Sequence, residues 1–322
     1  MRVFKYFVFF ILLFAMLAGI SGWIEKEMIK NDDYVQERNK NIYQVRKEPR
    51  NTIDMVVIGD SLSYTSVSPM KLWEDCGITS YIGGQPGQSI QESYHMLKSI
   101  LKRQAPKLVI LETHTLFREI SGAKGLKKIL EEWGNYNFSL FRGHDIWKSV
   151  LMGKKYTEEN YKGFSFRCEI DPYEKGSYMK KNKTVLEIPK SSVRYMEKIQ
   201  KLRTKNNAKL LLVSTPSPRN YNYSRHNGIK KYAKEYSMEY LDMNLNLNEI
   251  GINWKTDSLD KGDHLNLLGA QKVTEYLEKY LNRHHRMPDH RSDDSYKDWR
   301  ILNTKYQGEA EINVKKMLGK AG

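Results

Sequence analysis

Short apolar runs alternate with amphipathic helical patterns along most of the chain. Strands are expected where the runs are bounded by Gly, Pro, Asp or Asn, as buried parallel strands tend to be, at 53–58, 78–82, 107–112, 208–214 and 238–242. Helices are expected around 90–101, 192–204, 225–236 and 273–281. This alternation predicts an α/β fold with a doubly wound, five-stranded parallel sheet and helices on both faces, a three-layer arrangement. In such sheets, functional sites form beyond the carboxyl ends of the strands.

The first part of the chain is predicted to cross a membrane. Arg2 and Lys5 precede an apolar run over 6–20, which is extended to residue 24 by small and apolar side chains. At 1.5 Å per residue the run is just long enough to span a hydrocarbon core of about 30 Å. The preceding positive charges place the N-terminus in the cytoplasm and the rest of the chain outside. A cleaved signal peptide remains the alternative, because Ala15, Ala18 and Gly19 supply small residues near its end.

Composition divides the whole chain into four segments. Residues 1–24 are interpreted as a transmembrane signal anchor, 25–50 as a polar membrane-proximal stalk, 51–284 as an α/β domain, and 285–322 as a charged C-terminal tail. Within the domain, 117–190 breaks the alternation and is interpreted as an insertion over or beside the site. In the tail, Trp299, Ile301 and Tyr306 indicate that part of it folds back as a short helix.

Composition narrows the classes of partner. The 322 residues carry a formal net charge of +15, which is compatible with nucleic acid, an anionic membrane surface or an anionic polymer. Export makes a nucleic-acid role unexpected, so the charge is matched either to cell-surface polymers and lipid headgroups or to a solvated basic surface. Cys76 and Cys168 are expected to be two inert thiols, and no Cys/His cluster has metal-ligand spacing. No cofactor or metal is expected.

The first chemical signal is a serine at the end of a strand. The segment 56–61 reads Val-Val-Ile-Gly-Asp-Ser, so that the Ser61 hydroxyl lies at the carboxyl end of a buried strand. A serine hydroxyl becomes an effective nucleophile only when a base removes its proton. Without a base, the same segment is a polar turn.

The second signal supplies such a base just before the last helix. His264 lies 203 residues after Ser61, within Asp-Lys-Gly-Asp-His over 260–264. A catalytic histidine needs a carboxylate that fixes its tautomer. Asp260 is favoured because a carboxylate four residues earlier can fold back onto the ring, and the adjacent Asp263 is the alternative acid. The other interpretation is that His264 merely begins a helix with Asp263 as its N-cap.

A glycine-rich segment follows the second strand. Residues 83–89 read Gly-Gly-Gln-Pro-Gly-Gln-Ser, and a glycine there lets a backbone N–H approach a developing oxyanion. The sequence contains no phosphate-binding loop, no dinucleotide fingerprint and no G-x-S-x-G elbow.

Together, these three segments resemble the SGNH (GDSL-like) hydrolase superfamily over about 53–281. The resemblance implies Ser61 as nucleophile, His264 as base, and the backbone N–H groups of Ser61 and Gly87 as oxyanion donors. The block after the third strand reads Leu-Glu-Thr-His-Thr and lacks the superfamily's oxyanion asparagine. Thr113 or His114 is the candidate replacement, and His114 is equally interpretable as structural. The acid also lies one residue further from the histidine than in the superfamily's Asp-x-x-His.

A narrower resemblance extends to membrane-anchored proteins of Gram-positive bacteria. The anchor, the Asp-His-Leu-Asn block and the segments at 141–145 and 288–291 are similar to D-alanyl transfer proteins of teichoic-acid modification and to partners of membrane-bound O-acyltransferases. This implies a cell-membrane enzyme, an esterase or an O-acyltransferase, that handles acyl esters of a cell-surface polymer. A non-catalytic scaffold beside a membrane acyltransferase is the alternative. Candidate contacts for an anionic substrate are Arg142, His144, Arg219 and Arg291, each of which is also interpretable as a surface charge.

Overall fold

The computed structural model describes residues 2–118, 122–143, 145–156 and 159–321. These residues form two compact units. The N-terminal unit comprises Met1–Glu48 and Ile120–Glu159, and the sheet unit comprises Pro49–Glu119 and Asn160–Gly322. Each is described by itself.

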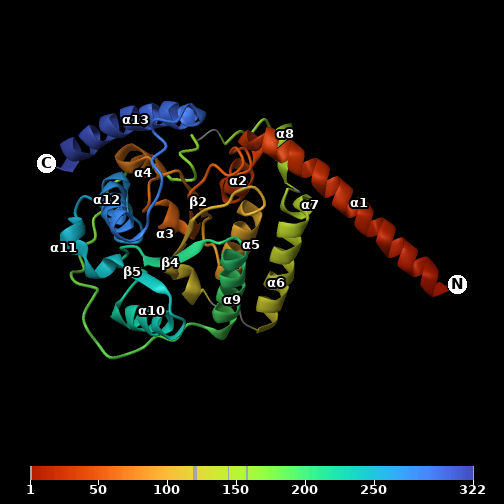
Figure 1. Cartoon of the computed structure of the whole chain (residues 1–322), viewed down its shortest axis with the longest axis horizontal. Helices are drawn as coiled ribbons and strands as arrows, with labels where there is room; N and C mark the ends of the chain where they lie inside the picture. The colour runs from red at the N-terminus through yellow and green to blue at the C-terminus, as the bar shows by residue number, and fades with distance from the viewer. Residues whose placement is uncertain (1, 119–121, 144, 157–158, 322) are drawn as a thin grey trace. The chain divides into compact units, whose positions relative to one another are not determined.

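The sheet unit contains the expected five-stranded parallel sheet (Figure 1). Its strand order, β2-β1-β3-β4-β5, is that of a doubly wound sheet. The chain adds β2 on one side of β1 and then adds β3, β4 and β5 on the other side, so the strand order reverses at β1. The predicted strands and the fold class are confirmed, with boundaries that shift by two residues or fewer. The strands are β1 (Met55–Gly59), β2 (Ser80–Gly84), β3 (Leu108–Glu112), β4 (Lys209–Ser214) and β5 (Glu239–Asp242).

Helices cover both faces of the sheet, as the alternation predicts. Figure 1 shows α4 and α12 together on one side of the strands, with α5 and α9 on the other. Successive residues of a strand point to opposite faces. Val57 accordingly joins the core cluster with Leu72 of α4 and Leu277 of α12, whereas Ile58 faces the α5 side. The helices of this unit are α3 (Ser61–Tyr64), α4 (Pro69–Cys76), α5 (Ile90–Ile100), η2 (Thr113–Phe117), α9 (Lys190–Lys205), α10 (Tyr223–Glu235), η3 (Met243–Leu245), α11 (Leu247–Ile250), α12 (Leu267–His284), η4 (Asp294–Tyr296) and α13 (Lys297–Ala321).

The charged tail is not a short helix, because α13 extends over 25 residues. Its buried side chains are Trp299, Tyr306, Ala310 and Met317, which recur at spacings of seven, four and seven and so lie on one helical face. That face packs in part against α4 and α12. The buried residues are widely spaced and charged residues lie between them, which is why the sequence indicates little of this helix.

The N-terminal unit is helical. It consists of α1 (Arg2–Lys30), η1 (Asp32–Tyr34), α2 (Glu37–Gln44), α6 (Gly122–Asn137), α7 (Ser139–Arg142) and α8 (Ile146–Leu151). The α1 segment Val3–Lys30 is long and apolar enough to cross a membrane, and only 6% of its most apolar window is buried.

The structure divides the stalk and the insertion differently from the sequence. Ile42, Tyr43 and Val45, in the expected stalk, are buried in the same unit as the first part of the insertion. The second part of the insertion, from 160 to 189, belongs to the sheet unit and contains no regular helix or strand among its residues. The apolar residues of 25–50 are too few to suggest a core by themselves, since partners such as Ser139 and Arg142, beside Tyr43, come from a distant segment.

Replacing Tyr306 by Ala tests whether α13 is part of the sheet unit. The Tyr306 ring packs against the rings of Tyr161, Phe164 and Phe166, and its hydroxyl accepts a hydrogen bond from Ser68 at 3.0 Å. We expect a loss of about 3–5 kcal/mol in the free energy of unfolding, as for other buried aromatic truncations, measured by urea denaturation. Ile301→Ala, on the same helix but 67% exposed, is the matched control. Equal small effects in both variants would contradict this packing.

Candidate active site

The turn after β1 places Ser61 at the start of a short helix. Asp60 caps that helix, because its Oδ1 accepts the Leu62 backbone N–H at 3.1 Å. The preceding Gly59 is tightly enclosed, and an added Cβ would lie 2.7 Å from the Glu112 Cβ and 2.8 Å from the Ser63 Cβ. The sequence therefore needs glycine at this point, and the close packing fixes the direction in which the Ser61 side chain leaves the sheet.

Ser61, His264 and Asp260 form one hydrogen-bonded chain. The Ser61 Oγ lies 2.7 Å from the His264 Nε2, and the His264 Nδ1 lies 2.6 Å from the Asp260 Oδ2. The other carboxylate oxygen of Asp260 accepts the His264 backbone N–H at 2.7 Å. With Nδ1–H donating to Asp260, Nε2 is the acceptor for the serine proton, which is the arrangement of a general base.

A braced loop holds the histidine. Lys261 and Gly262 adopt positive φ angles of 56° and 83°, which turns the chain so that Asp260 and His264 face each other. A Cβ on Gly262 would meet the Tyr173 ring at 2.9 Å. The Lys261 N–H donates to the Asp171 carbonyl at 2.9 Å. The second part of the insertion therefore supports the histidine loop directly.

Burial and charge have opposite effects on the pKa values of His264 and Asp260. Burial alone would lower the pKa of His264, but the hydrogen bond and negative charge of Asp260 outweigh it and raise that pKa above 6.5. Partial burial of Asp260 opposes ionisation, yet its hydrogen bonds from His264 lower its pKa. The pair therefore favours an ionised carboxylate that stabilises an imidazolium.

Asp263 has a different role from Asp260. Its Oδ1 is 3.8 Å from the His264 Nδ1, beyond hydrogen-bonding distance, and instead accepts the Asn220 Nδ2–H at 2.5 Å. Its carbonyl accepts the Ser217 hydroxyl at 2.7 Å. The geometry thus favours Asp260 as the partner of His264. Asp263 instead ties the histidine loop to the segment after β4.

The expected oxyanion residues lie at the ends of adjacent strands. Gly59 and Gly84 pair in the parallel register, so the segments leading to Ser61 and Gly87 leave the sheet at the same edge. Gly87 has a φ of 64°, a conformation that glycine adopts without strain. Thr113 is fully buried, and its hydroxyl pairs with the Ser214 hydroxyl at 2.6 Å.

His114 and Arg118 bind the carboxylate of Asp60, a cluster that the sequence motifs do not reveal. The fully buried Asp60 Oδ2 lies 2.7 Å from the His114 Nδ1 and accepts the Arg118 Nε–H at 3.0 Å. Burial opposes ionisation of Asp60, but the hydrogen bond and charge of His114, together with the charge of Arg118, lower its pKa. Next to it, burial and the Asp60 charge raise the pKa of Glu112 well above its usual range. The paired carboxylate of Asp60 in the turn before Ser61 therefore lies near the carboxyl group of Glu112 at the end of β3, which favours its neutral form.

A second buried histidine–aspartate pair lies at the ends of β4 and β5. The His226 Nδ1 is 2.7 Å from the Asp242 Oδ2, and the Tyr221 hydroxyl donates to the same oxygen at 2.8 Å. Tyr240 and Ser214 connect this pair to Thr113 through hydroxyl contacts of 2.5–3.0 Å. The hydroxyl chain cross-links three strand ends, and no motif in the sequence signals it.

The proposed substrate-binding residues are not all brought to the site. Arg219 is exposed, and its charge contributes to the lowered pKa of Asp260. Arg142 belongs to the N-terminal unit, where its guanidinium lies 3.9 Å from the centroid of the Tyr136 ring. Arg291 donates to the carbonyls of Glu74 and Asp75. Its neighbour His290 binds Asp54 before β1, at the opposite edge of the sheet from Ser61. His144 lies outside the described residues.

One group of side chains has the composition of a metal site. The ligand atoms of Asp260, Asp263 and His264 lie within 4.8 Å of one another. Both ring nitrogens of His264 already have protein partners, so an ion would have to displace Asp260 or Ser61. The donors fit a hydrogen-bonded relay better than an ion site.

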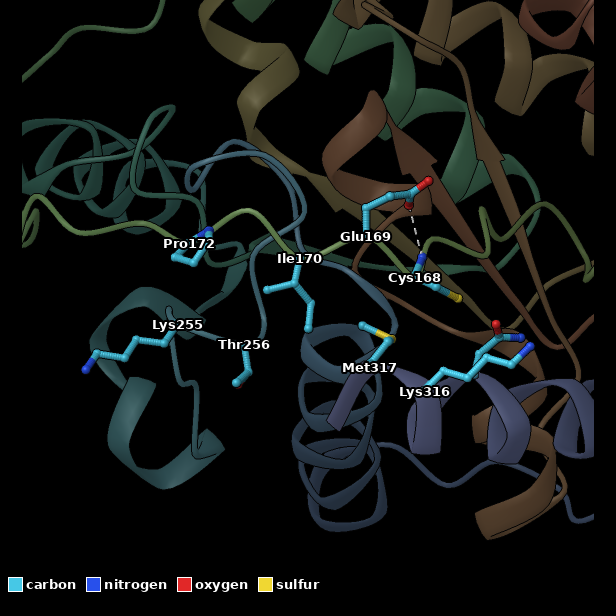
Figure 2. Close-up of a pocket in the computed structure, with 9 residues that line it drawn as sticks. Cys168, Glu169, Ile170, Pro172, Lys255, Thr256, Lys316 and Met317 are labelled. Carbon is cyan, nitrogen blue, oxygen red and sulfur yellow. Dashed lines mark hydrogen bonds between the residues drawn. The ribbon is translucent and has the colours of Figure 1, made fainter. Parts of the chain in front are cut away.

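A pocket of about 720 Å³ lies beside the histidine loop in the sheet unit (Figure 2). Figure 2 shows Ile170, Thr256 and Met317 near its centre. The side-chain amide of Asn266 donates to the carbonyls of Glu169 and Thr256, which both line the pocket, and so connects these two segments. None of Ser61, Asp260 and His264 lines this pocket.

No family model and no curated protein matches the chain. Among solved structures, a GDSL-like lipase from Bacteroides thetaiotaomicron matches with 12% identity and a TM-score of 0.36, over 80% of this chain and 97% of that one. A two-domain esterase active on acetylated mannans matches with 13% identity and a TM-score of 0.37, over 79% and 56% of the two chains. An acetyl xylan esterase from the rumen bacterium Butyrivibrio proteoclasticus matches with 11% identity and a TM-score of 0.34, over 73% and 65%.

Separate alanine variants of Asp260 and Asp263 test which carboxylate serves His264. Asp260→Ala removes the partner of Nδ1, and we expect kcat for a chromogenic ester such as p-nitrophenyl acetate to fall about 10³–10⁴-fold, as when the aspartate of a known serine hydrolase triad is replaced. Asp263→Ala is the matched control and retains most of the activity. The reverse order of effects would contradict the assignment.

The pH dependence of kcat/KM follows from the raised pKa of His264. Only the neutral imidazole accepts the Ser61 proton, so activity is lost as the pH falls through the pKa of His264 in the folded protein. We expect the midpoint of this acid limb to lie above 6.5. In Asp260→Asn the residual activity should show a midpoint at lower pH, because the negative charge of Asp260, which raises this pKa, is gone. An unshifted midpoint in this variant would mean that another group controls the limb.

Proposed function

We propose that the protein is a membrane-anchored serine esterase or O-acyltransferase of the SGNH type. The observation that carries this proposal is the Ser61–His264–Asp260 chain, with contacts of 2.7 and 2.6 Å. The proposed substrate is an acyl ester of a cell-surface polysaccharide or teichoic-acid-like polymer. The substrate class is motivated by the resemblance of the sequence motifs and by the net charge of +15, which suits an anionic polymer.

The first half of the reaction transfers the acyl group to the enzyme. His264 accepts the Ser61 proton at Nε2 while Ser61 Oγ attacks the ester carbonyl. Asp260 stabilises the imidazolium that results. The tetrahedral intermediate then collapses, the C–O bond to the leaving alcohol breaks, and His264 returns the proton to that alcohol.

Backbone N–H groups are proposed to bind the oxyanion in this step. Ser61 lies at the N-terminus of α3, and Gly87 follows the neighbouring strand at the same edge of the sheet. One such donor typically contributes about 3–4 kcal/mol to lowering the barrier. Of the two proposed side-chain replacements for the missing asparagine, His114 is favoured over Thr113, whose hydroxyl is engaged with Ser214.

The second half resolves the acyl-enzyme with a hydroxyl acceptor. Water gives hydrolysis, whereas a polymer hydroxyl gives acyl transfer, and in both cases His264 removes the proton from the acceptor. Both outcomes use the same three side chains. A partner acyltransferase in the membrane is one source of the acyl group under this proposal.

Membrane attachment is proposed through α1. The helix is apolar over a length that spans a bilayer, and Arg2 and Lys5 at its start favour a cytoplasmic N-terminus with the sheet unit outside. Within the N-terminal unit, Ser21 and Met28 of α1 are buried. This burial favours a retained anchor over a cleaved signal peptide, because cleavage after residue 22 would remove part of a packed helix.

The scaffold alternative is weakened by the same geometry. A binding subunit has no need for a serine hydroxyl, an imidazole and a carboxylate aligned within hydrogen-bonding distance. Ser61 is also partly exposed rather than buried.

An acyl-transfer assay tests the proposed function. The full-length protein in detergent would be incubated with an acetylated polysaccharide or a synthetic acetyl ester, with and without an oligosaccharide acceptor, and the products would be quantified by mass spectrometry. We expect free acetate or acetylated acceptor from the wild type and at least a 10³-fold lower rate from Ser61→Ala. Equal rates for the two proteins would leave the scaffold interpretation as the better one.

A further inference from the structure

Helix α6 of the N-terminal unit exposes an apolar stripe. Leu126, Leu130 and Trp133 are 60%, 61% and 51% exposed, and their spacings of four and three residues place them on one face. The opposite side is polar, with an i,i+4 ion pair of 3.6 Å between Lys127 and Glu131. A helix with this pattern usually buries its apolar face.

The end of α6 leads into a segment that packs against α1. The Phe138 ring lies 5.6 Å from the Phe14 ring in an edge-on contact and 5.9 Å from the Trp133 ring. Phe14 is eleven residues after Val3 and so lies well inside the apolar part of α1. The aromatic contacts therefore connect the exposed stripe to the part of α1 that is proposed to lie in lipid.

The residues that follow Phe138 contact the polar end of α1. The Leu140 N–H donates to the Ser21 hydroxyl at 3.5 Å, and the Ser139 hydroxyl donates to Glu25 at 3.4 Å. The polar end of α1 thus meets α7, whereas its apolar part meets the junction of α6 and α7. Because Trp133 lies against Phe138 and Phe138 lies against Phe14, the C-terminal end of α6 is connected to the apolar part of α1.

From these contacts we propose that α6 is a second membrane-contacting element, whose Leu126–Leu130–Trp133 stripe inserts into the bilayer that α1 crosses. The occupant of the stripe is lipid. Tryptophan and leucine on one face with lysine and glutamate on the other is the composition of helices that lie in the bilayer interface. The inference rests on the proposed anchoring role of α1, but it is independent of the chemistry at Ser61.

Two points of membrane contact have a consequence for the unit. A single spanning helix leaves its attached unit free to rotate about the helix axis. A second helix seated in the same bilayer restricts that rotation and fixes which side of the N-terminal unit faces the lipid.

Fluorescent probes at neighbouring positions test the inference. Full-length protein with Cys76→Ser and Cys168→Ser would carry a single environment-sensitive label at Leu130→Cys or Glu131→Cys, which lie at the same level of α6 on different faces. A label at Phe9→Cys, in the apolar part of α1, reports insertion of the anchor. Each variant is reconstituted into phosphatidylcholine vesicles that contain chain-nitroxide lipid, and aqueous iodide is the second quencher.

The expected result is several-fold stronger nitroxide quenching at 130 than at 131, with the reverse order for iodide, and strong nitroxide quenching at 9. Equal iodide access at 130 and 131 with a quenched label at 9 would overturn the inference and leave the anchor intact. An unquenched label at 9 would overturn both the anchor and the inference. Protection of 130 only in native membranes, and not in pure lipid, would overturn lipid as the occupant in favour of a membrane protein. Ester turnover of the same preparations reports separately on the proposed catalytic function.

Discussion

The site depends on two short contacts, one at each ring nitrogen of the His264 imidazole. One nitrogen faces Asp260 and the other faces Ser61, which lies 203 residues away in the chain. Three features of the fold bring them together: the end of β1, the positive φ angles at Lys261 and Gly262, and the braces from the second part of the insertion. A shift in any of these would break a contact that has only a few tenths of an ångström of tolerance.

The buried charge of Asp60, next to Ser61, is the main energetic cost of this arrangement. A carboxylate such as that of Asp60, removed from water, is stable only when it is paired and hydrogen bonded. His114, Arg118 and the Leu62 N–H supply those partners. These partners hold Asp60 in place, although it contacts neither His264 nor the carboxylate of Asp260. Burial, together with the negative charge of Asp60, raises the pKa of Glu112 and explains its neutral tendency.

The sequence predicts the sheet and the relay because both leave local signals. Apolar runs mark the strands, and the strand–Gly-Asp-Ser segment and the Asp-His block mark Ser61 and His264 in their structural context. The partners of Asp60 leave none, since His114 and Arg118 come from another strand end, 54 and 58 residues away. The packing of residues 25–50 escaped prediction for the same reason, because partners of Tyr43 such as Ser139 and Arg142 come from a distant segment. Helix α13 was underestimated since its buried residues are widely spaced among charges.

The most direct measurement of the central claim is covalent labelling of full-length protein by a fluorophosphonate probe, with the adduct mapped by mass spectrometry. An activated serine reacts with this probe, whereas an ordinary serine hydroxyl does not. We expect a single adduct on Ser61 that is absent from Ser61→Ala and forms much more slowly in His264→Ala. A folded wild-type protein that remains unlabelled under conditions that label a known serine hydrolase would contradict the account, as would an adduct on a different serine.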